Sequence, residues 1–524
     1  MNPSTSAASL VGGTESRSAW LFSWPLVVGT LTYLYALLPG SGMLSDGDSY
    51  WHIATGRWII ENAAIPSTDP FSQTMQGRIW TAQSWLSELI LAQSWLWASW
   101  TGAVAVTALA FAAAMALLTR ALLRHFEPLY ALLFVALAVG LIAPHLLVRP
   151  HVLIMPLMVL WSTELVHACD EGRAPRWPFI LVMPLWANLH GGFTIGLALA
   201  GALATEAVIN APDRARRVTA VRAWGLFLAA SVAGALATPH GLQGILYTWQ
   251  TFTDAGYSLT LIREWQSPDF QRHRPFEIWV LFVFGTALFL GIRLPPMRVL
   301  ILLGLLHLAL MHARAIENLG LVAPLLVGQS LAQRFGWGRP APADASALDE
   351  LFHRLVRPAG LGAVAVSTIV LATTSWTLHL HRPPTPPAGT APEAAIRAVE
   401  QADIRSPVLN GYGWGGYLIH RGIHPFIDGR ADMYGEKFLR EYRDATSLKT
   451  SEAPQHLLDK YQIGWTLFPV ESPIIAVLDR IPGWGRLYTD SIAVVHVRVT
   501  AGLNGDAPSR RPPADRTAHG EVPN

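Results

Sequence analysis

The sequence is poor in charge, in lysine and in cysteine. Only 14% of its 524 residues are charged, while 51% are hydrophobic. A soluble globular protein carries about 25% charged residues, so the composition excludes an ordinary soluble enzyme, and its hydrophobic content excludes a disordered chain. The single cysteine, Cys169, excludes a disulfide scaffold and predicts an isolated thiol. A formal net charge of +2 gives no electrostatic basis for binding nucleic acid. The composition therefore predicts a polytopic membrane protein.

What the sequence does contain is a series of long apolar runs. A membrane-spanning helix needs about 20 mainly apolar residues, because each residue rises about 1.5 Å through a hydrocarbon core of about 30 Å. Eleven runs are expected spans: 19–39, 100–120, 128–144, 150–167, 176–188, 192–211, 222–239, 275–292, 298–312, 317–334 and 358–378. They predict a mostly α fold, a polytopic bundle of membrane helices.

Arginine is concentrated in every second connection between these runs. No lysine precedes Lys437, and the arginines gather in the connections 120–127, 168–176, 211–222, 292–298 and 334–357. Cytoplasmic loops carry the excess of basic residues in membrane proteins. We therefore expect the N-terminus inside and the chain after about residue 379 outside.

The remaining segments predict the domain organisation. Residues 1–18 form a cytoplasmic tail, and the membrane domain 19–379 has a structured first external loop at 40–99. In that loop, helical spacing predicts a helix over 50–62. The tryptophans of 82–98 favour a helix lying at the membrane interface, with packing in a core as the alternative.

A proline-rich linker at 380–390 leads to a small extracytoplasmic α/β domain at 391–500, followed by a disordered tail at 501–524. Within that domain the patterns predict helices at 391–403, 436–448 and 453–461, and strands at 406–419, 424–428, 463–470 and 490–499.

The connections assigned to the outside carry most of the polar chemistry, whereas the inner ones are plain arginine-flanked connectors. Ionisable groups at membrane depth are costly, so their concentration at one face predicts a shared outward cavity. The alternative is that headgroups solvate them one by one. The polar residues at outer span ends include Arg149, His151, His190, His240, Arg263, Glu264 and Arg314.

Asp46 and Asp48 flank a glycine just after the first span, and His52 follows four residues later. A helix that starts near Ser49 would place His52 close to both carboxylates. Such ligands suit Mg²⁺ or Mn²⁺, with Glu264 as a further ligand, and a carboxylate there can also act as a general base on a hydroxyl group. The alternative is that the two aspartates only cap a helix and make a turn.

The basic residues at the outer span ends suit a lipid phosphate, because a guanidinium binds phosphate as a planar fork and histidine supplements it. We assign this phosphate-binding role to Arg149, His151, His190, His240, His312 and Arg314. His52 and Arg263 are further candidates for substrate binding. Individually, each such residue is more often a headgroup contact or a helix cap.

Two glycine-rich segments stand out in the C-terminal part. They contain Trp414 and Tyr417 in one, and Asp428 and Arg430 in the other. Glycine lets the backbone approach a ligand closely, and aromatic rings offer faces for stacking on sugars, so these four residues are further candidates for substrate binding. The alternative is glycine-rich turns with an Asp428–Arg430 ion pair.

The layout resembles the GT-C superfamily, the integral membrane glycosyltransferases that use polyprenyl-phosphate or polyprenyl-pyrophosphate sugar donors. Asp46-Gly-Asp-Ser-Tyr-Trp-His52 is similar to the first-loop motif of oligosaccharyltransferase catalytic subunits, and Glu264-Trp-Gln-Ser-Pro268 is similar to their Ser-Val-Ser-Glu-His-Gln-Pro segment. Tyr412-Gly-Trp-Gly-Gly-Tyr417 takes the place of their Trp-Trp-Asp-Tyr-Gly motif. The sequence also resembles bacterial multi-pass membrane proteins that share its Trp-Ala-Asn-Leu-His-Gly-Gly and Asp-Gly-Arg-Ala-Asp segments. It contains no Trp-Trp-Asp, which argues against a peptide acceptor.

The resemblance implies a GT-C-like bundle in a bacterial cytoplasmic membrane with a periplasmic C-terminal domain. It implies an inverting transfer of a sugar from a polyprenyl-linked donor to a glycan, lipid or protein acceptor outside the cytoplasm, assisted by Mg²⁺ or Mn²⁺. Asp46 and Asp48 would be the metal-binding or acceptor-activating carboxylates, with Asp46 the expected base, and Glu264 would position the acceptor. Two alternatives remain: a lipid or glycan transporter, which usually shows internal repeats, and a non-catalytic scaffold that binds glycan.

Overall fold

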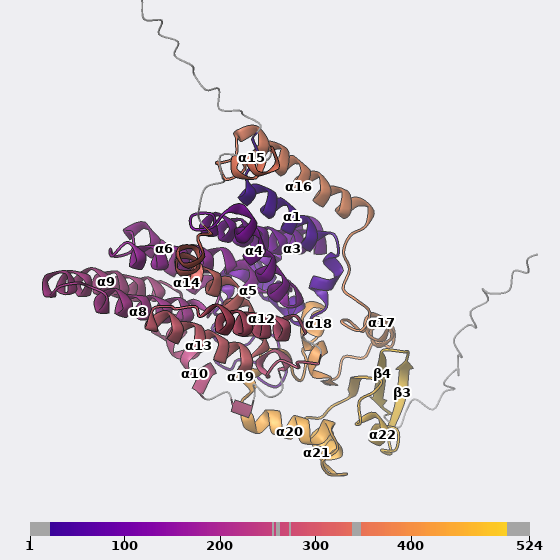
Figure 1. The fold of residues 1–524 in the computed structure, drawn as a ribbon. Coiled ribbons are helices and arrows are strands. Elements are labelled where there is room, and N and C mark those ends of the chain that lie inside the picture. Colours follow the sequence, from indigo (N-terminus) through magenta and orange to yellow (C-terminus); the bar gives the residue numbers. More distant parts are fainter. Residues whose placement is uncertain (1–20, 254–255, 258–261, 272–273, 338–346, 500–524) are drawn as a thin grey trace, which may run out of the picture. The chain divides into compact units, whose positions relative to one another are not determined.

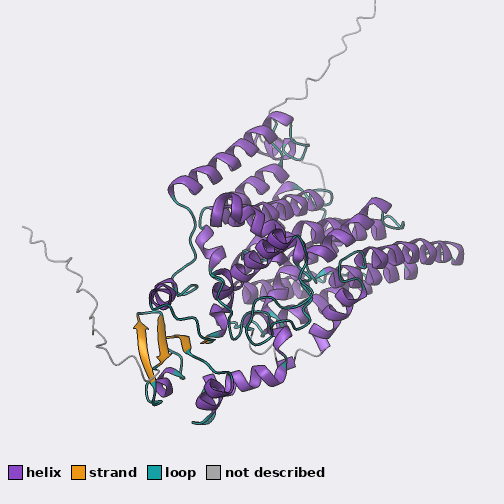
Figure 2. Cartoon of the chain, turned by 180° about the vertical axis from the view of Figure 1, so that it is seen from behind, coloured by secondary structure: helices purple, strands orange, loops and turns teal. Residues whose placement is uncertain are grey.

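The computed structural model is mostly helical, with one small sheet in the C-terminal part of the chain (Figures 1 and 2). It describes residues 21–253, 256–257, 262–271, 274–337 and 347–499, so the predicted tails at 1–18 and 501–524 lie outside the described residues. The chain forms two compact units, one of residues 1–393 and 410–443, the other of residues 394–409 and 444–524. This division differs from the single C-terminal domain at 391–500 that the sequence predicts.

Helices occupy every one of the eleven ranges predicted as spans. Within the described part of the chain, five helical stretches are long and apolar enough to cross a membrane: α3 (Trp85–Leu122), α4 (Pro128–Ile142) with η2 (Ala143–His145), α9 (Arg214–Ala235), η5 (Ala313–Ala315) with α14 (Ile316–Phe335), and α16 (Leu361–His381). The other predicted spans hold shorter helices: α1 (Trp24–Leu37), α5 (Pro150–Leu153), α6 (Met155–Asp170), η3 (Trp177–Leu181), α7 (Val182–Leu189), α8 (Phe193–Ile209), α12 (Arg274–Leu290) and α13 (Pro296–Met311). The number of spans stays a prediction.

The helical bundle buries large side chains inside and leaves others exposed on its surface. Trp161, Trp186 and Trp224 are at most 1% exposed. By contrast, Phe289 on α12 is 89% exposed and Trp376 on α16 is 62% exposed. Apolar side chains exposed along a helix are costly in water and favourable in lipid, so these faces have the chemistry of lipid-facing surfaces.

The first external loop folds onto the bundle. After η1 (Gly40–Leu44), helix α2 (Asp48–Asn62) confirms the helix predicted at 50–62 and packs along α3. Helix α3 is interrupted at Ala98 and Ser99, whose backbone is not helical, and φ of Ser99 is 50°. The stretch before this break matches the separate helix predicted at 82–98; its place at a membrane interface stays a prediction.

The strand predicted at 406–419 is wrong over most of its length. Only β1 (Val408–Asn410) is a strand; η6 (Tyr412–Trp414) and α18 (Gly415–His420) follow it, and 424–428 is not a strand either. The glycines of this segment bring its backbone within reach of Gly47 and Ile427, and α18 packs on α2. A short run of buried residues is compatible with both helix and strand, so the sequence pattern did not distinguish α18 from a strand.

The first unit also contains α10 (Leu242–Thr253), η4 (Arg263–Trp265), α15 (Ala347–Arg354), α19 (Ala431–Tyr434) and α20 (Glu436–Thr446). The second unit holds a sheet of order β1-β2-β4-β3, in which β2 (Trp465–Pro469) and β3 (Trp484–Thr489) each pair antiparallel with β4 (Ala493–Arg498). Helices α17 (Glu393–Gln401), α21 (Ala453–Lys460) and α22 (Ile475–Leu478) accompany it. Here β2, β4 and the three helices predicted at 391–403, 436–448 and 453–461 are confirmed, whereas β3 was not predicted.

Candidate active site

A cavity of about 350 Å³ lies within the first unit, among the segments that the sequence assigns to the outer face. Its wall combines residues far apart in the chain, from α2, from the first turn of α3, from the connections before α5, α8 and α14, from α10 and η4, and from residues 429–432. Most of the polar residues predicted at outer span ends, including Arg149, His151, His190, Glu264 and Arg314, line this cavity. The polar residues of these connections thus line one shared cavity, as the sequence predicts.

Arg149 is the centre of a cluster of three carboxylates. Its Nε is ion-paired with Asp46, its Nη2 with Asp48, and its Nη1 lies 2.5 Å from Oε2 of Glu264. The Arg149 side chain is 10% exposed, whereas those of Asp46, Asp48 and Glu264 are 22%, 24% and 28% exposed. The guanidinium is therefore enclosed by carboxylates that still reach open space.

Local backbone contacts place Arg149 beside the two aspartates. The amide of Val148 donates to the carbonyl of Met43 at 2.9 Å, and the hydroxyl of Ser49 donates to the carbonyl of Val148 at 3.0 Å. Arg149 itself is extended and directly precedes Pro150, which starts α5. A residue before proline favours extended backbone, so the sequence itself presents this side chain to the loop that carries Asp46 and Asp48.

Glu264 reaches the cluster because the segment around it is bound to the start of α14. The amide of Ala313 donates to the carbonyl of Gln266 at 3.0 Å, and Nδ1 of His312 lies 2.6 Å from the carbonyl oxygen of Trp265. The guanidinium of Arg314 lies over the Trp265 ring, 4.6 Å from its centroid. These contacts hold η4 against η5 and direct Glu264 towards Arg149.

The cluster has one carboxylate whose protonation changes near neutral pH. Burial raises the pKa of Asp48 to about 7; the charge of Arg149 lowers it, and the neighbouring Asp46 and Glu264 raise it. Burial also raises the pKa of Asp46. Burial alone would raise the pKa of Glu264, but the charges of Arg149 and Arg314 hold it below its ordinary value. Glu264 is thus ionised at pH 7, while Asp48 can exchange a proton.

These residues do not fit the four-ligand metal centre that the sequence predicts. The point where the carboxylates of Asp46, Asp48 and Glu264 meet is taken by the guanidinium of Arg149. His52 is bound to a different carboxylate, with its Nδ1 3.1 Å from Oε1 of Glu88. Within the described ranges, no three side chains of His, Cys, Asp or Glu are arranged to hold a metal ion. The cation that the carboxylates bind is the chain's own arginine.

Arg314 differs from Arg149 in having no carboxylate partner. It lines the cavity and stacks on Trp265, and no carboxylate of the described residues lies within ion-pair distance of its guanidinium. His151 and His190 share the cavity wall with it, and Nε2 of His151 lies 3.6 Å from Oε2 of Glu317. An unpaired guanidinium with neighbouring imidazoles is a suitable site for an anionic group.

Two of the residues predicted at outer span ends are not placed in the wall. His240 lies outside the cavity lining, and its Nε2 is 3.2 Å from the carbonyl oxygen of Ala82, so it positions the segment that leads into α3. The side chain of Arg263 lies outside the described residues.

The glycine-rich segments pack against the loop that carries Asp46 and Asp48. A Cβ atom at Gly429 would lie 1.9 Å from Oδ1 of Asp48, and one at Gly416 would lie 2.4 Å from the carbonyl oxygen of Gly47. Contacts this short leave no room for a side chain. The sequence suggests that these glycines let the backbone approach a ligand, whereas in the structure they approach the backbone of Gly47 and the carboxylate of Asp48.

Trp414 and Tyr417 are buried and already have partners in the protein. Trp414 is 5% exposed and its Nε1 donates to the carbonyl of Gly389 at 2.9 Å, while Tyr417 is 3% exposed and packs edge-on against Tyr50. Neither ring presents an open face for stacking on a sugar, and neither lines the cavity.

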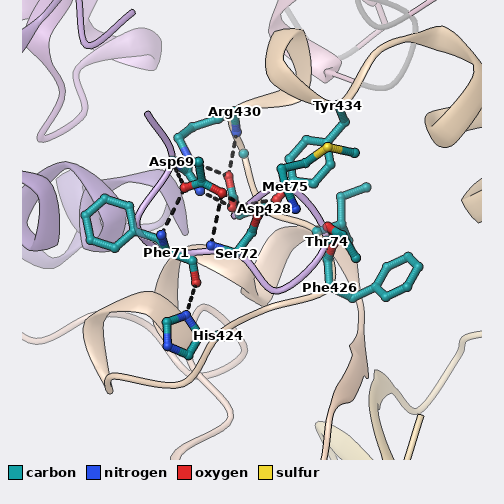
Figure 3. A network of polar contacts seen from close by, with 12 residues as sticks. Asp69, Phe71, Ser72, Thr74, Met75, His424, Phe426, Asp428, Arg430 and Tyr434 are labelled. Carbon is teal, nitrogen blue, oxygen red and sulfur yellow. Dashed lines mark hydrogen bonds and ion pairs between the residues drawn. The ribbon is translucent and has the colours of Figure 1, made fainter. Parts of the chain in front are cut away.

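Asp428 and Arg430 form a closed ion-pair network with the first external loop, shown in Figure 3. Arg430 donates from Nε and Nη2 to the two oxygens of Asp428, at 2.8 and 2.6 Å, and from Nη1 to Asp69 at 2.8 Å. The hydroxyl of Tyr434 donates to Asp428 at 2.7 Å. All three charged side chains are at most 1% exposed.

Backbone contacts extend this network along the same loop. His424 Nδ1 lies 2.6 Å from the carbonyl oxygen of Phe71, and the hydroxyl of Thr74 donates to the carbonyl of Phe426 at 2.7 Å (Figure 3). The Arg430 guanidinium also lies over the Trp80 ring, 4.7 Å from its centroid. The Asp428–Arg430 segment thus forms an ion pair, which is the alternative given for it in the sequence analysis. The contacts around this pair hold residues 69–80 against residues 424–434.

Sequence reasoning missed several polar residues of the cavity wall, among them Glu88, Tyr247 and Asp432. Glu88 is bound to His52, and Tyr247 donates its hydroxyl hydrogen bond to Asp432. A carboxylate within the apolar start of α3 was the available signal for Glu88, because ionisable groups in apolar helices usually have a function. Nothing in the sequence pairs Tyr247 with Asp432, which are far apart in the chain.

No protein family matches the sequence, and no curated protein is significantly similar to it. Among solved structures, the oligosaccharyltransferase of Archaeoglobus fulgidus with a tethered NVT-sequon peptide matches with 12% identity and a TM-score of 0.49, over 85% of this chain and 69% of that one. AglB of the same organism, in complex with an inhibitory peptide and a dolichol-phosphate, matches with 10% identity and a TM-score of 0.46, over 85% of this chain and 69% of that one. ArnT of Cupriavidus metallidurans bound to undecaprenyl phosphate matches with 14% identity and a TM-score of 0.46, over 92% of this chain and 98% of that one.

Similarities with TM-scores below 0.5 carry no argument about the reaction. The described part of the chain is mostly helical and contains several helices that are long and apolar enough to cross a membrane, so it has the composition of a multi-pass membrane protein.

Proposed function

We propose that the protein is a membrane glycosyltransferase that transfers a sugar from a polyprenyl-phosphate or polyprenyl-pyrophosphate donor to a hydroxyl group outside the cytoplasm, with inversion at the anomeric carbon. The observation that carries the proposal is the composition of one cavity. It contains an unpaired guanidinium, Arg314, and an acidic cluster that includes a carboxylate titrating near neutral pH, Asp48. The first suits a donor phosphate, and the second suits the activation of a hydroxyl group.

In this mechanism Asp48 is the general base. It lines the cavity, whereas Asp46 does not, so the structure favours Asp48 over the Asp46 that the sequence analysis preferred. The acceptor oxygen forms a bond to the anomeric carbon while the bond from that carbon to the phosphate oxygen breaks, and the hydroxyl proton goes to Asp48. Asp46 holds Arg149 in place, and ionised Glu264 binds and orients the acceptor.

The leaving phosphate stays on the basic side of the cavity. Arg314 carries no competing carboxylate, and His151 and His190 lie in the same wall. Burial, together with the charges of Arg149, His190 and His151, lowers the pKa of His52 well below its ordinary value, so His52 is neutral at pH 7. The role of a divalent ion stays a prediction of the family resemblance, and no step here runs through one.

The test is a transfer assay with purified protein in lipid nanodiscs. A panel of polyprenyl-phosphate and polyprenyl-pyrophosphate sugars is offered with sugar and glycolipid acceptors, and products are followed by mass spectrometry. The proposal predicts release of polyprenyl phosphate or pyrophosphate coupled to glycosylation of an acceptor, lost in Asp48→Asn. Binding of the lipid without turnover, equal in wild type and Asp48→Asn, would favour a transporter or a scaffold.

A further inference from the structure

Glu88 is an ionisable residue of the cavity wall to which the mechanism gives no role. It lies in the first turn of α3, its side chain is 1% exposed, and it lines the cavity. Its Oε1 is 3.1 Å from Nδ1 of His52, while its Oε2 has no hydrogen-bond partner among the described residues. A buried carboxylate oxygen without a donor is unfavourable, so such an atom usually receives a donor from water or a ligand.

The surrounding contacts hold Glu88 rigidly. A Cβ atom at Gly56 would lie 2.0 Å from the carbonyl oxygen of Glu88, so α2 and α3 touch through their backbones at this point. The hydroxyl of the adjacent Ser87 donates to the carbonyl of Leu189 at 2.8 Å. The ring centroid of His52 lies 3.6 Å from that of Trp51. A fixed carboxylate of this kind is preorganised for a ligand and does not need to reorganise on binding.

Glu88 is near the proposed transfer cluster without belonging to it. His52 lies four residues after Asp48 on α2, which places the two side chains one turn apart on the same face of the helix. The three carboxylates of the cluster are bound to Arg149, and Glu88 is not. Burial raises the pKa of Glu88 to about 8, so this group is mostly protonated at pH 7 and suits the part of the cavity where the neutral part of a substrate would lie.

The residues that share this part of the wall have the chemistry of a sugar site. The Trp51 and Trp80 rings line the cavity there, together with the amide of Gln83 and the hydroxyl of Tyr247. The Gln83 amide donates to the carbonyl of Gly244 at 3.0 Å and to the hydroxyl of Thr248 at 2.9 Å, which fixes its orientation. Aromatic faces combined with fixed, hydrogen-bonding polar groups recognise hydroxylated rings.

We propose that Oε2 of Glu88 accepts a hydrogen bond from a hydroxyl group of a bound sugar ring, with His52 as the residue that positions the carboxylate. The inference deepens the proposed function and rests on it for the identity of the lipid. The sugar is either that of the donor or that of the acceptor, since both present the same hydroxyl chemistry.

The experiment compares two lipids and two variants in nanodiscs. Binding of undecaprenyl phosphate and of undecaprenyl-phosphate-linked hexoses and pentoses is measured by native mass spectrometry for wild type, Glu88→Gln and Glu206→Gln. Glu206 is a matched control, because it is a buried glutamate that binds Arg298 and does not line the cavity. We expect Glu88→Gln to weaken binding of the sugar-linked lipid by about three- to tenfold, the scale of one net hydrogen bond, with binding of the sugar-free lipid unchanged. Glu206→Gln should change neither affinity.

A second measurement separates the donor sugar from an acceptor sugar. Saturation-transfer NMR with free glucose, galactose, mannose, N-acetylglucosamine and arabinose follows sugar binding without lipid. A signal in wild type that is lost in Glu88→Gln, without an effect on the lipids, places an acceptor sugar at Glu88. If wild type binds no polyprenyl lipid but this signal is still lost in the variant, the proposed donor class is wrong and the sugar site stands. The inference is overturned if wild type and Glu88→Gln bind every ligand equally. It is also overturned if a folded Glu88→Gln variant loses binding of both lipids to the same extent.

Discussion

Arg149 and Arg430 are both buried arginines that bind more than one carboxylate. They differ in the exposure of their partners, and this difference distinguishes a cluster that can meet a substrate from an ion-pair network that stabilises the fold. Arg430 reaches the cavity wall, but its partners Asp69 and Asp428 are at most 1% exposed and do not line the cavity, and Tyr434 supplies a further donor to Asp428 (Figure 3). The partners of Arg149 remain 22% to 28% exposed, and Asp48 and Glu264 among them line a cavity.

The two networks also differ in how their charges are balanced. Burial alone would raise the pKa of Asp428, but Arg430 and Tyr434 hold it below its ordinary value, so this carboxylate stays ionised. In the Arg149 cluster, three carboxylates share one guanidinium, and the pKa of Asp48 rises to about 7. A closed, fully bonded network stabilises one arrangement, whereas an open and incompletely neutralised one can exchange protons with a substrate.

The largest effect that this comparison predicts is on activity. Asp48→Asn removes the base, and we expect the transfer rate to fall by about 10²- to 10⁴-fold, the usual contribution of general base catalysis. The melting temperature should stay close to that of wild type, because the side chain keeps its size. Both quantities are measured on the same nanodisc preparation. An active Asp48→Asn protein would remove Asp48 from the mechanism.

The second effect is on stability at Arg430. Asp428→Ala leaves a buried guanidinium with one carboxylate, and breaking a buried ion pair costs about 3–5 kcal/mol of unfolding free energy. Denaturant or thermal unfolding in detergent measures the loss. Glu350→Ala is the control: its pair with Arg354 is exposed, so it should change stability by about 0–1 kcal/mol. Equal stabilities of the two variants would contradict the structural role of the network.

Arg149→Lys should lower activity by a smaller factor. An ammonium group is a single point charge and cannot bond three carboxylates in the directions that the guanidinium does. Losing one charge-assisted hydrogen bond, about 1.5–3 kcal/mol, corresponds to a loss of about 10- to 100-fold in kcat/KM. Arg298→Lys is the matched control, because Arg298 binds Asp170 and Glu206 away from the cavity. It should lower stability and leave kcat/KM unchanged; the opposite pattern would reverse our assignment.

The pH dependence sharpens the contrast between the two networks. A base with a pKa of about 7 is active when deprotonated, so log kcat/KM should rise with unit slope below about pH 7 and level off above it. The lowered pKa of Asp428 means that its contribution to stability is present above its ordinary pKa of about 3.9 and is lost only as the pH falls below that value. The contribution of the Arg430 network, measured as the difference in unfolding free energy between wild type and Asp428→Ala, should therefore be level between pH 5 and 8 while activity changes. Parallel loss of both would show that the rate profile reports unfolding.

The smallest expected effect is that of a chelator. Because the guanidinium of Arg149 takes the point where the carboxylates meet, EDTA should change the transfer rate by less than about twofold. Activity that is lost in EDTA and restored by Mn²⁺ would show that an ion binds among these carboxylates after all.

The sequence was informative where a local pattern is enough. Apolar runs located helices in all eleven predicted ranges, and the spacing around Asp46, Asp48 and Glu264 selected three carboxylates that meet in the structure. It was less informative where the partner is distant in the chain. Arg149 was selected for phosphate binding, and its position between the carboxylates depends on contacts of Val148 with Met43 and Ser49 that no local pattern encodes.

The same limit explains the motifs whose roles changed. The glycines near Trp414 and Asp428 signal a close backbone approach, but the sequence does not show that the approach is to Gly47 and Asp48. Strand β3 was missed because its residues are half-buried or exposed without alternation, and the strand expected at 406–419 was replaced by α18, which packs on α2.

The most direct test of the central claim is a single-turnover transfer assay in nanodiscs with polyprenyl-phosphate and polyprenyl-pyrophosphate sugars, comparing wild type, Asp48→Asn and Glu350→Ala. The account predicts glycosylated product from wild type and Glu350→Ala at equal rates, and lipid binding without product from Asp48→Asn. Product formation by Asp48→Asn at the wild-type rate would contradict it, because the cavity would then not be the site of transfer.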